Sequence, residues 1–382
     1  MTQENPPAQG GKWKVEDLKV GQVVETTFWI NPVKEGRFRF RATHLAGRRA
    51  PKVVLCDDPR IRAGLPCRVK IARITKTNRT DRGSIEVEFL QGTPLEIKGV
   101  YVDPLVDRKL QVLLESGLNI LLVGPQGCGK TVLARTLAGT LGMEFVLFNC
   151  GGVLEAGDFL ASLQVCAGEG GQPLTKFIKT ELLDALLQAR DNPKRRYLVF
   201  LDELNRCPEN ARNVLMPALD ATRRIFNPVD NTFLEIPDNV QFIGAVNMGR
   251  EFSGTFGIDA AQLDRFAPLR MDYMPADAEV QLLQERHPEL GKGLLQEIVR
   301  VANAVRNDAG VGRGLSVRAT DEVCTYLKHP LIEHEQKSLL PALMKGSFCG
   351  RFDGHPDDEH SDAGAVWRLI EKELGPKLAP SG

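Results

Sequence analysis

The fold is decided by the stretch Gly124-Pro125-Gln126-Gly127-Cys128-Gly129-Lys130-Thr131, which is followed by Val132. It fits the pattern G-x-x-x-x-G-K-[ST], in which glycines let the backbone curl until its N–H groups face a phosphate. An apolar run at 119–123 precedes it with the length of a buried strand, and 131–138 has the apolar spacing of a helix. A helix that begins here adds a favourable dipole for an anion. The sequence therefore predicts a P-loop that binds a nucleoside triphosphate.

A second strand ends in two carboxylates about 70 residues further on. Residues 195–201 are mostly apolar and lead directly into Asp202 and Glu203. Parallel strands bring their carboxyl ends to the same edge of a sheet, where ligands bind. We expect Asp202, with the Thr131 hydroxyl, to hold Mg²⁺ and Glu203 to deprotonate the attacking water, while Lys130 neutralises phosphate charge. The alternative is a pair of carboxylates that cap a helix.

A third apolar strand, 240–246, ends in Asn247. An amide at this edge can hydrogen-bond the γ-phosphate or position the water without adding charge. The alternative is an ordinary turn asparagine.

The pattern along the chain predicts an α/β protein with an all-β domain in front and helices behind. Short alternating runs at 23–30, 38–43, 52–55, 67–72 and 84–89 indicate a small barrel of OB or SH3 type. Strands then alternate with helices, which is typical of a parallel sheet. The predicted parts are a disordered tail at 1–11, the barrel at 12–92, a linker at 93–104, an α/β core at 105–275, and a helical subdomain with the C-terminal tail at 276–382.

Three local predictions concern the core. The glycine-rich segment 151–171 is expected to be a loop, and 174–189 a helix. Residues 223–237 are expected to form a hairpin with Asp230 and Asn231 at its tip.

The distribution of charge and of cysteines limits which binding partners and which cellular location we expect for this protein. The net charge is zero, but 12–88 holds 18 Lys and Arg against 9 Asp and Glu. In the barrel, Arg37, Arg39 and Arg41 alternate with apolar residues, which favours a solvated or protein-docking face over a nucleic-acid surface.

The eight cysteines are scattered, and no apolar stretch has the length of a signal region or membrane span, so we expect a cytoplasmic protein without membrane contact. The acidic loop at 353–362 with its two histidines favours solvation over metal binding.

Taken together, these residues resemble an AAA+ ATPase. The run Asp202-Glu203-Leu204-Asn205-Arg206 is similar to that of the MoxR, cobalt-chelatase small-subunit, McrB and dynein-related branch, and so is the segment 254–266 with its Leu-Asp-Arg-Phe ending. The resemblance covers about 100–325. It implies a P-loop core with a helical lid, the cofactors ATP and Mg²⁺, a pore-facing insert within 151–171, and a hairpin of the kind seen at 223–237.

The resemblance also implies roles for residues outside the P-loop. Asn247 matches the sensor-1 position, and Arg265 matches the arginine finger that acts in a neighbouring subunit's site. Arg318, in Ser316-Val317-Arg318-Ala319, matches the sensor-2 arginine that contacts the γ-phosphate. Arg206 is an interface candidate, and the competing arginines are Arg270 and Arg313.

The function implied is ATP hydrolysis by a homo-oligomeric ring, a hexamer, that remodels or activates a protein client. The client implied by the branch carries a von Willebrand A-type domain. The main alternative is a McrB-like nucleic-acid translocase or defence subunit whose basic barrel binds DNA or RNA. A third alternative is a scaffold that assembles on ATP without hydrolysing it, against which Glu203 argues.

Overall fold

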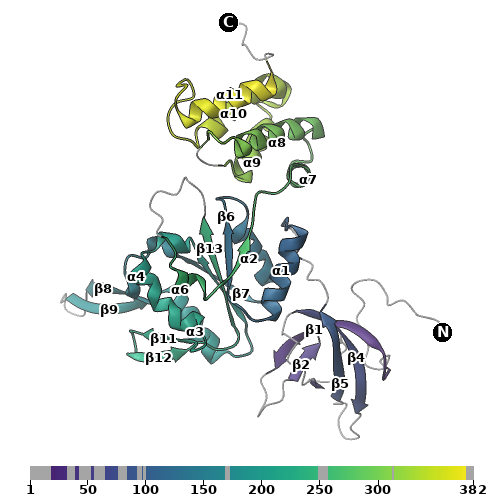
Figure 1. The fold of residues 1–382 in the computed structure, drawn as a ribbon, viewed down its shortest axis with the longest axis vertical. Coiled ribbons are helices and arrows are strands. Elements are labelled where there is room, and N and C mark those ends of the chain that lie inside the picture. Colours follow the sequence, from purple (N-terminus) through teal and green to yellow (C-terminus); the bar gives the residue numbers. More distant parts are fainter. Residues whose placement is uncertain are drawn as a thin grey trace.

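The computed structural model describes residues 19–31, 39–42, 53–55, 65–75, 84–92, 97, 100–167, 173–247, 257–311 and 314–375. Figure 1 shows three parts in chain order: a β-barrel, a sheet flanked by helices, and a group of helices. The predicted tail at 1–11, the side chains of Arg37, Arg39 and Arg41, and Arg313 lie outside the described residues.

The N-terminal part is a closed barrel with the strand order β1-β2-β3-β5-β4. β3 lies parallel to β5, and the other neighbours are antiparallel. Because β3 is beside β5 rather than β4, the barrel is a five-stranded Greek key of the OB type. The predicted barrel is confirmed, with strands β1 Val23–Asn31, β2 Arg39–Ala42, β3 Val53–Leu55, β4 Pro66–Thr75 and β5 Ser84–Gly92.

The central part is a five-stranded parallel sheet with the order β14-β6-β13-β10-β7. Alternate side chains of each strand enter different cores. In β10, Val199 and Leu201 face one core, whereas Leu198 and Phe200 face the other. Burial on both faces explains why the inner strands β6, β10 and β13 are mostly apolar. The strands are β6 Ile120–Gly124, β7 Glu144–Asn149, β10 Tyr197–Asp202, β13 Val240–Asn247 and β14 Ala267–Arg270.

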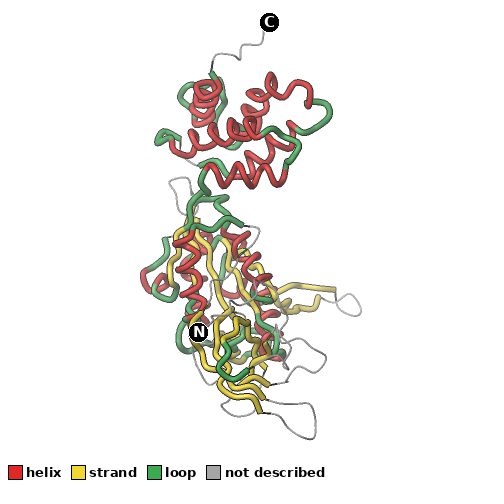
Figure 2. Tube along the Cα trace, turned by 90° about the vertical axis from the view of Figure 1, so that its right-hand side faces the viewer, coloured by secondary structure: helices red, strands yellow, loops and turns green. Residues whose placement is uncertain are grey.

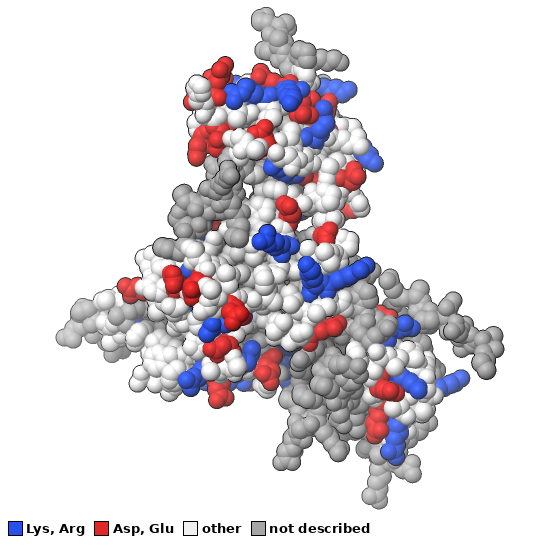
Figure 3. Space-filling view, in the orientation of Figure 1, with Lys and Arg blue, Asp and Glu red and all other residues white. Residues whose placement is uncertain are grey.

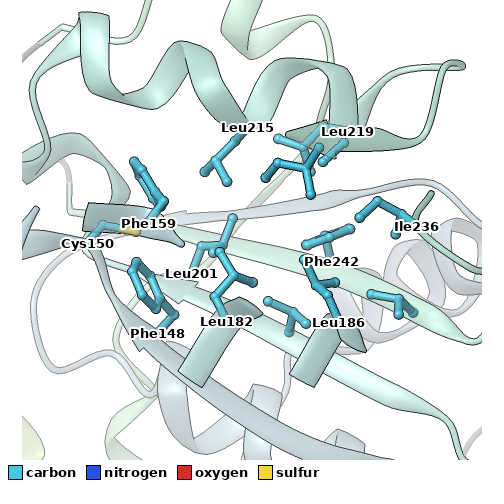
Figure 4. Close-up of a cluster of buried hydrophobic side chains, with 14 of the residues drawn as sticks. Phe148, Cys150, Phe159, Leu182, Leu186, Leu201, Leu215, Leu219, Ile236 and Phe242 are labelled. Atoms are coloured by element: carbon cyan, nitrogen blue, oxygen red, sulfur yellow. The ribbon is translucent and has the colours of Figure 1, made fainter. Parts of the chain in front are cut away.

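Helices cover both faces of the sheet. α1 Pro104–Glu115 and α2 Lys130–Thr140 pack on one face, and α3 Glu181–Asp191 packs on the other. Figure 4 shows the second core, where Leu182 and Leu186 of α3 lie near Leu201 of β10 and Phe242 of β13. The short helices of this part are α4 Glu209–Arg212, α5 Met216–Leu219 and α6 Ala260–Leu263.

The C-terminal part is helical and has its own core of buried side chains. We call it the lid, and Figure 2 shows it as a group of helices beyond the end of the sheet. The predicted helical subdomain is confirmed. Its helices are α7 Ala276–Arg286, α8 Lys292–Asn307, α9 Val317–Leu327, α10 Gln336–Met344 and α11 Asp362–Leu374, with a π-helical turn at Lys345–Cys349.

Two predictions for the core segment were wrong. The predicted loop at 151–171 contains the strand β8 Ala161–Ala167, and the predicted helix at 174–189 begins with β9 Pro173–Lys179. These strands form an antiparallel hairpin. The helix begins only after Thr180, whose hydroxyl oxygen accepts from the Leu183 N–H at 3.2 Å and thus caps α3.

The predicted hairpin at 223–237 is confirmed as β11 Arg224–Asn227 and β12 Thr232–Glu235. Asn231 at its tip has φ +53°, a left-handed conformation that asparagine tolerates. Among the described residues, no helix is both long and apolar enough to cross a bilayer.

Candidate functional site

The P-loop joins the end of β6 to the start of α2, as the sequence predicts. Gly127 (φ +76°) and Gly129 (φ +96°) both have left-handed backbones that disfavour other residues. A Cβ atom at Gly124 would lie 2.4 Å from the carbonyl oxygen of Met271, so this glycine is required by close approach to the strand-end segment beside it. The loop is thus shaped by its glycines before any ligand is considered.

Lys130 is the buried cation of the loop, with only 6% of its surface exposed. Its Nζ donates to the carbonyl oxygens of Gly124 (2.9 Å) and Pro125 (2.8 Å). Burial lowers the pKa of Lys130, and the negative charges of Asp202 and Glu203 oppose that shift. Phosphate oxygens can replace the two carbonyls as partners of this ammonium group, since both are acceptors.

Thr131 and Asp202 come together from distant parts of the sequence. The Thr131 hydroxyl donates to Asp202 Oδ2 at 3.0 Å, linking the first turn of α2 to the end of β10. Hydroxyl and carboxylate oxygens are the ligands that Mg²⁺ prefers. These two side chains therefore fit the predicted Mg²⁺ site, where the cation would neutralise phosphate charge.

Glu203 follows Asp202 in a strained backbone conformation, with φ +52° and ψ +40°. A left-handed non-glycine residue is costly and is found most often at functional sites. Its N–H donates to Asp202 Oδ1 at 3.0 Å, and its carboxylate pairs with Arg206 at 3.4 Å. The turn separates the two carboxylates, so that one is bound to Thr131 and the other faces Arg206.

Asn247 ends β13 beside Gly124, its register partner at the end of β6. Its backbone is held by Asn205, whose Nδ2 donates to the Asn247 carbonyl at 2.9 Å and whose Oδ1 accepts from the Asn247 N–H at 3.4 Å. Both asparagines are buried. Asn205 lies within the Asp202–Arg206 motif, but no role was predicted for it from the sequence. The missed signal is that a buried amide after a strand needs partners, which the next strand end supplies.

Arg265 lies away from these residues. The Asn119 side chain, just before β6, donates to the Arg265 carbonyl at 3.1 Å, whereas the P-loop begins at the other end of β6. β6 has five residues, so its first and last residues are about 13 Å apart at about 3.3 Å per residue. The Arg265 side chain donates to the Ala261 carbonyl and lies 4.0 Å from Asp220. The phosphate site and Arg265 of one chain are therefore at opposite ends of a strand.

The other predicted arginines are exposed. Arg318 is in the first turn of α9, and Arg270 ends β14 beside Val123. Of the predicted site residues, the structure brings together the P-loop, Asp202, Glu203 and Asn247, and it leaves Arg265 apart. Within the described ranges there is no cluster of three or more His, Cys, Asp or Glu side chains suited to a metal ion, and this includes the loop at 353–362.

Comparisons with known proteins agree with this architecture. Residues 119–266 match the AAA domain of the dynein-related subfamily. The chain is 30% identical over 220 residues to a Thauera aromatica protein named "Putative chaperone BssE", covering 56% of this chain and 71% of that protein. It is 26% identical over 204 residues to an uncharacterized Staphylococcus saprophyticus protein, covering 53% and 74% of the two chains.

Among solved structures, a mutant of Thermotoga maritima RuvB aligns with a TM-score of 0.41 and 18% identity, over 61% of this chain and 66% of that one. Because its residues 119–266 match this AAA domain, and because it is 30% identical to the Thauera aromatica protein and covers 71% of it, the chain belongs to the AAA+ ATPases, in the dynein-related, MoxR-like branch.

Proposed function

We propose that this chain is an ATP-hydrolysing motor that works as a homo-oligomeric ring, a hexamer, and remodels or activates a protein client. One observation carries the proposal: Lys130 and Arg265 sit at opposite ends of β6. An arginine so placed cannot reach the phosphates held by its own P-loop. It can complete the site of a neighbouring copy, which makes a ring the active form.

The division of labour follows from the site. Lys130 and the P-loop N–H groups bind the β- and γ-phosphates, and Thr131 and Asp202 hold Mg²⁺. Glu203 accepts the proton of the attacking water, which Asn247 orients. Arg265 of the adjacent copy and Arg318 of the lid stabilise the charge that develops on the transferred phosphoryl group, because a guanidinium stays ionised.

We assign the contacts with the client to two hairpins of the core, β8–β9 and β11–β12. In β8–β9 the exposed fractions are 70% for Val165, 57% for Leu174 and 45% for Phe177, and in β11–β12 Phe233 is 60% exposed. The two hairpins project from the same side of the core in Figure 1. Exposed apolar groups gathered in this way are typical of protein-binding sites. The relative named as a chaperone supports a protein client, and a von Willebrand A-type domain in that client remains an expectation.

The nucleic-acid alternative gains no support from the described part of the barrel. On β4, Arg68, Lys70 and Arg73 lie opposite Glu25, Glu88 and Glu86, respectively, on the neighbouring strands. Opposite charges paired across strands leave little net field for a phosphate backbone. Figure 3 shows the same mixture of blue and red on the barrel. ATPase rates measured with and without DNA or RNA at two salt concentrations test the alternative. Strong stimulation that salt abolishes would favour it.

Mixing two inactive variants tests the motor. Glu203→Gln removes the base but keeps the arginine, and Arg265→Ala keeps the base but removes the arginine. Each alone should bind ATP and hydrolyse almost none. In a random mixture about one quarter of the sites pair an intact Glu203 with an intact Arg265 from the neighbour, so activity should return to about that fraction. Absence of rescue, with both variants folded and binding ATP, would overturn the proposal.

A further inference from the structure

Tyr273 connects the P-loop to the lid. It lies between β14 and α7, where the core ends and the lid begins. Its hydroxyl donates to the carbonyl oxygen of Gln126, in the P-loop, at 3.1 Å. A Cβ atom at Gly314 would lie 2.5 Å from the Tyr273 hydroxyl oxygen and 2.7 Å from its ring, so the side chain is packed directly against the segment that enters α9.

Arg306 also contacts the ring of this tyrosine. The Arg306 guanidinium carbon lies 5.0 Å from the centre of the Tyr273 ring, a cation–π distance. The Arg306 side chain is only 3% exposed and makes two bonds to the fully buried Glu279, at 2.5 and 3.0 Å. Tyr273 is thus in contact with an ion pair that is buried inside the lid.

That ion pair ties three segments of the lid together. Arg306 Nε, from α8, donates to the carbonyl of Leu315, two residues before α9, at 2.6 Å. The Thr320 hydroxyl, from α9, donates at 2.7 Å to Glu279, which belongs to α7. Because every charged group here is paired and bonded, α7, α8 and the start of α9 should move as one body.

The start of α9 also touches the P-loop. A Cβ atom at Gly127 would lie 2.3 Å from the Cβ of Ser316, the residue before the helix. Arg318 follows two positions later. The distance of Arg318 from the phosphate site therefore depends on how the lid packs on the P-loop.

We propose that Tyr273 is a positioning residue that couples the P-loop to the lid. Its hydroxyl moves with the Gln126 carbonyl to which it is bonded, and its ring packs against Arg306 and Gly314. A displacement of the tyrosine therefore displaces the start of α9, which carries Arg318. A change in the P-loop on ATP binding or phosphate release is passed to the lid through this contact. The inference rests on the proposed ATPase function and adds the residue that links the nucleotide site to lid motion.

Tyr273→Phe tests the coupling in the full chain, because it removes the hydroxyl and keeps the ring. We expect kcat for ATP hydrolysis to fall about fivefold, the weight of one ordinary hydrogen bond, with KM changed less than about twofold. Tyr326→Phe is the matched control. Its hydroxyl bonds to Glu322 on the exposed surface of the lid, so its loss should leave both constants unchanged.

A double-mutant cycle separates coupling from simple structural support. If Tyr273 acts by placing Arg318, then Tyr273→Phe should cause no further loss of kcat in the Arg318→Ala background. Additive losses, or an unchanged kcat for Tyr273→Phe alone, would overturn the proposal.

Hydrogen exchange gives a readout that does not require turnover. In the Glu203→Gln background, ATP should slow amide exchange in 317–327, and adding Tyr273→Phe should remove most of that protection while ATP still binds. Equal protection with and without the hydroxyl would show that Tyr273 does not transmit binding. If the unaltered chain hydrolyses no ATP, the proposed function is wrong, and the exchange result still decides the role of Tyr273.

Discussion

The hydroxyl of Thr131 lies 3.0 Å from a carboxylate oxygen of Asp202, 71 positions away in the sequence. β13 lies between the strands that lead to these residues, so the contact spans two strand spacings at the edge of the sheet. The hydroxyl proton is directed to Asp202, which leaves the oxygen lone pairs of Thr131 available to a cation. The geometry thus prepares a pair of oxygen ligands without placing two full negative charges together.

Thr131→Ala should weaken the response to Mg²⁺. The variant loses one oxygen ligand and the donor that orients Asp202, so we expect the Mg²⁺ concentration for half-maximal ATPase activity to rise at least about tenfold. Thr131→Ser keeps the hydroxyl and should stay close to the unaltered chain. Titration of the ATPase rate with Mg²⁺ at saturating ATP measures both. An alanine variant that titrates like the serine variant would contradict the assignment.

Asn205→Ala should destabilise the protein and displace Asn247, because Asn205 bonds to the Asn247 backbone. The two hydrogen bonds to the Asn247 backbone are buried, so their loss should cost about 1–3 kcal/mol in the free energy of unfolding and lower kcat by displacing Asn247. Asn205→Asp keeps the acceptor for the Asn247 N–H but places an oxygen against its carbonyl, so it should be no better. Urea unfolding followed by circular dichroism gives the free energy. Wild-type stability in both variants would show that the Asn205–Asn247 hydrogen bonds do not stabilise the protein.

The P-loop and the strands β6, β10 and β13 were predictable because their signals are local. Strands of five to eight mostly apolar residues with polar ends, and glycines at fixed spacing before Lys130, can be recognised without knowledge of the rest of the chain. The edge strand β14, with only four residues, was not predicted. The OB-type barrel was predictable in class, since alternating runs separated by turn residues leave few other folds. Its strand order required the structure.

The errors come from segments whose pattern is ambiguous. Residues 174–179 are apolar and charged in a mixture that fits a helix or a strand, and only the cap at Thr180 separates the two. Contacts such as Tyr273 with Gln126, 147 positions apart, carry no sequence signal. The positions of Arg265 and Asn205 likewise depend on which strands are neighbours, which is a property of the whole fold.

Cys128 should be the cysteine most open to alkylation among those whose side chains are described. It is half-buried, whereas the others are buried, and burial raises the pKa of Cys207 to about 11. Burial also raises the pKa of Cys128, so thiolate forms only as pH increases, and its labelling by iodoacetamide should rise about tenfold between pH 7 and pH 8. MgATP should protect it, because Lys130 lies 3.8 Å from the sulfur. Peptide mass spectrometry reads each site, and Cys207 reacting as fast would contradict the prediction.

Gly127→Ala and Gly129→Ala should differ in their effect on the lid, although both glycines have left-handed backbones. Alanine at either position costs about 1–2 kcal/mol in backbone strain. Only at Gly127 does the new Cβ also meet Ser316, at 2.3 Å, whereas the space at Gly129 is open.

Without nucleotide, Gly127→Ala should therefore lower the thermal unfolding midpoint more than Gly129→Ala. Ser316→Gly should restore part of that loss in the first variant and none in the second, because it removes the Cβ that a side chain at position 127 would meet and breaks no capping bond of α9. Equal midpoints for the two alanine variants, or rescue of both, would show that the lid does not rest on the P-loop at Gly127.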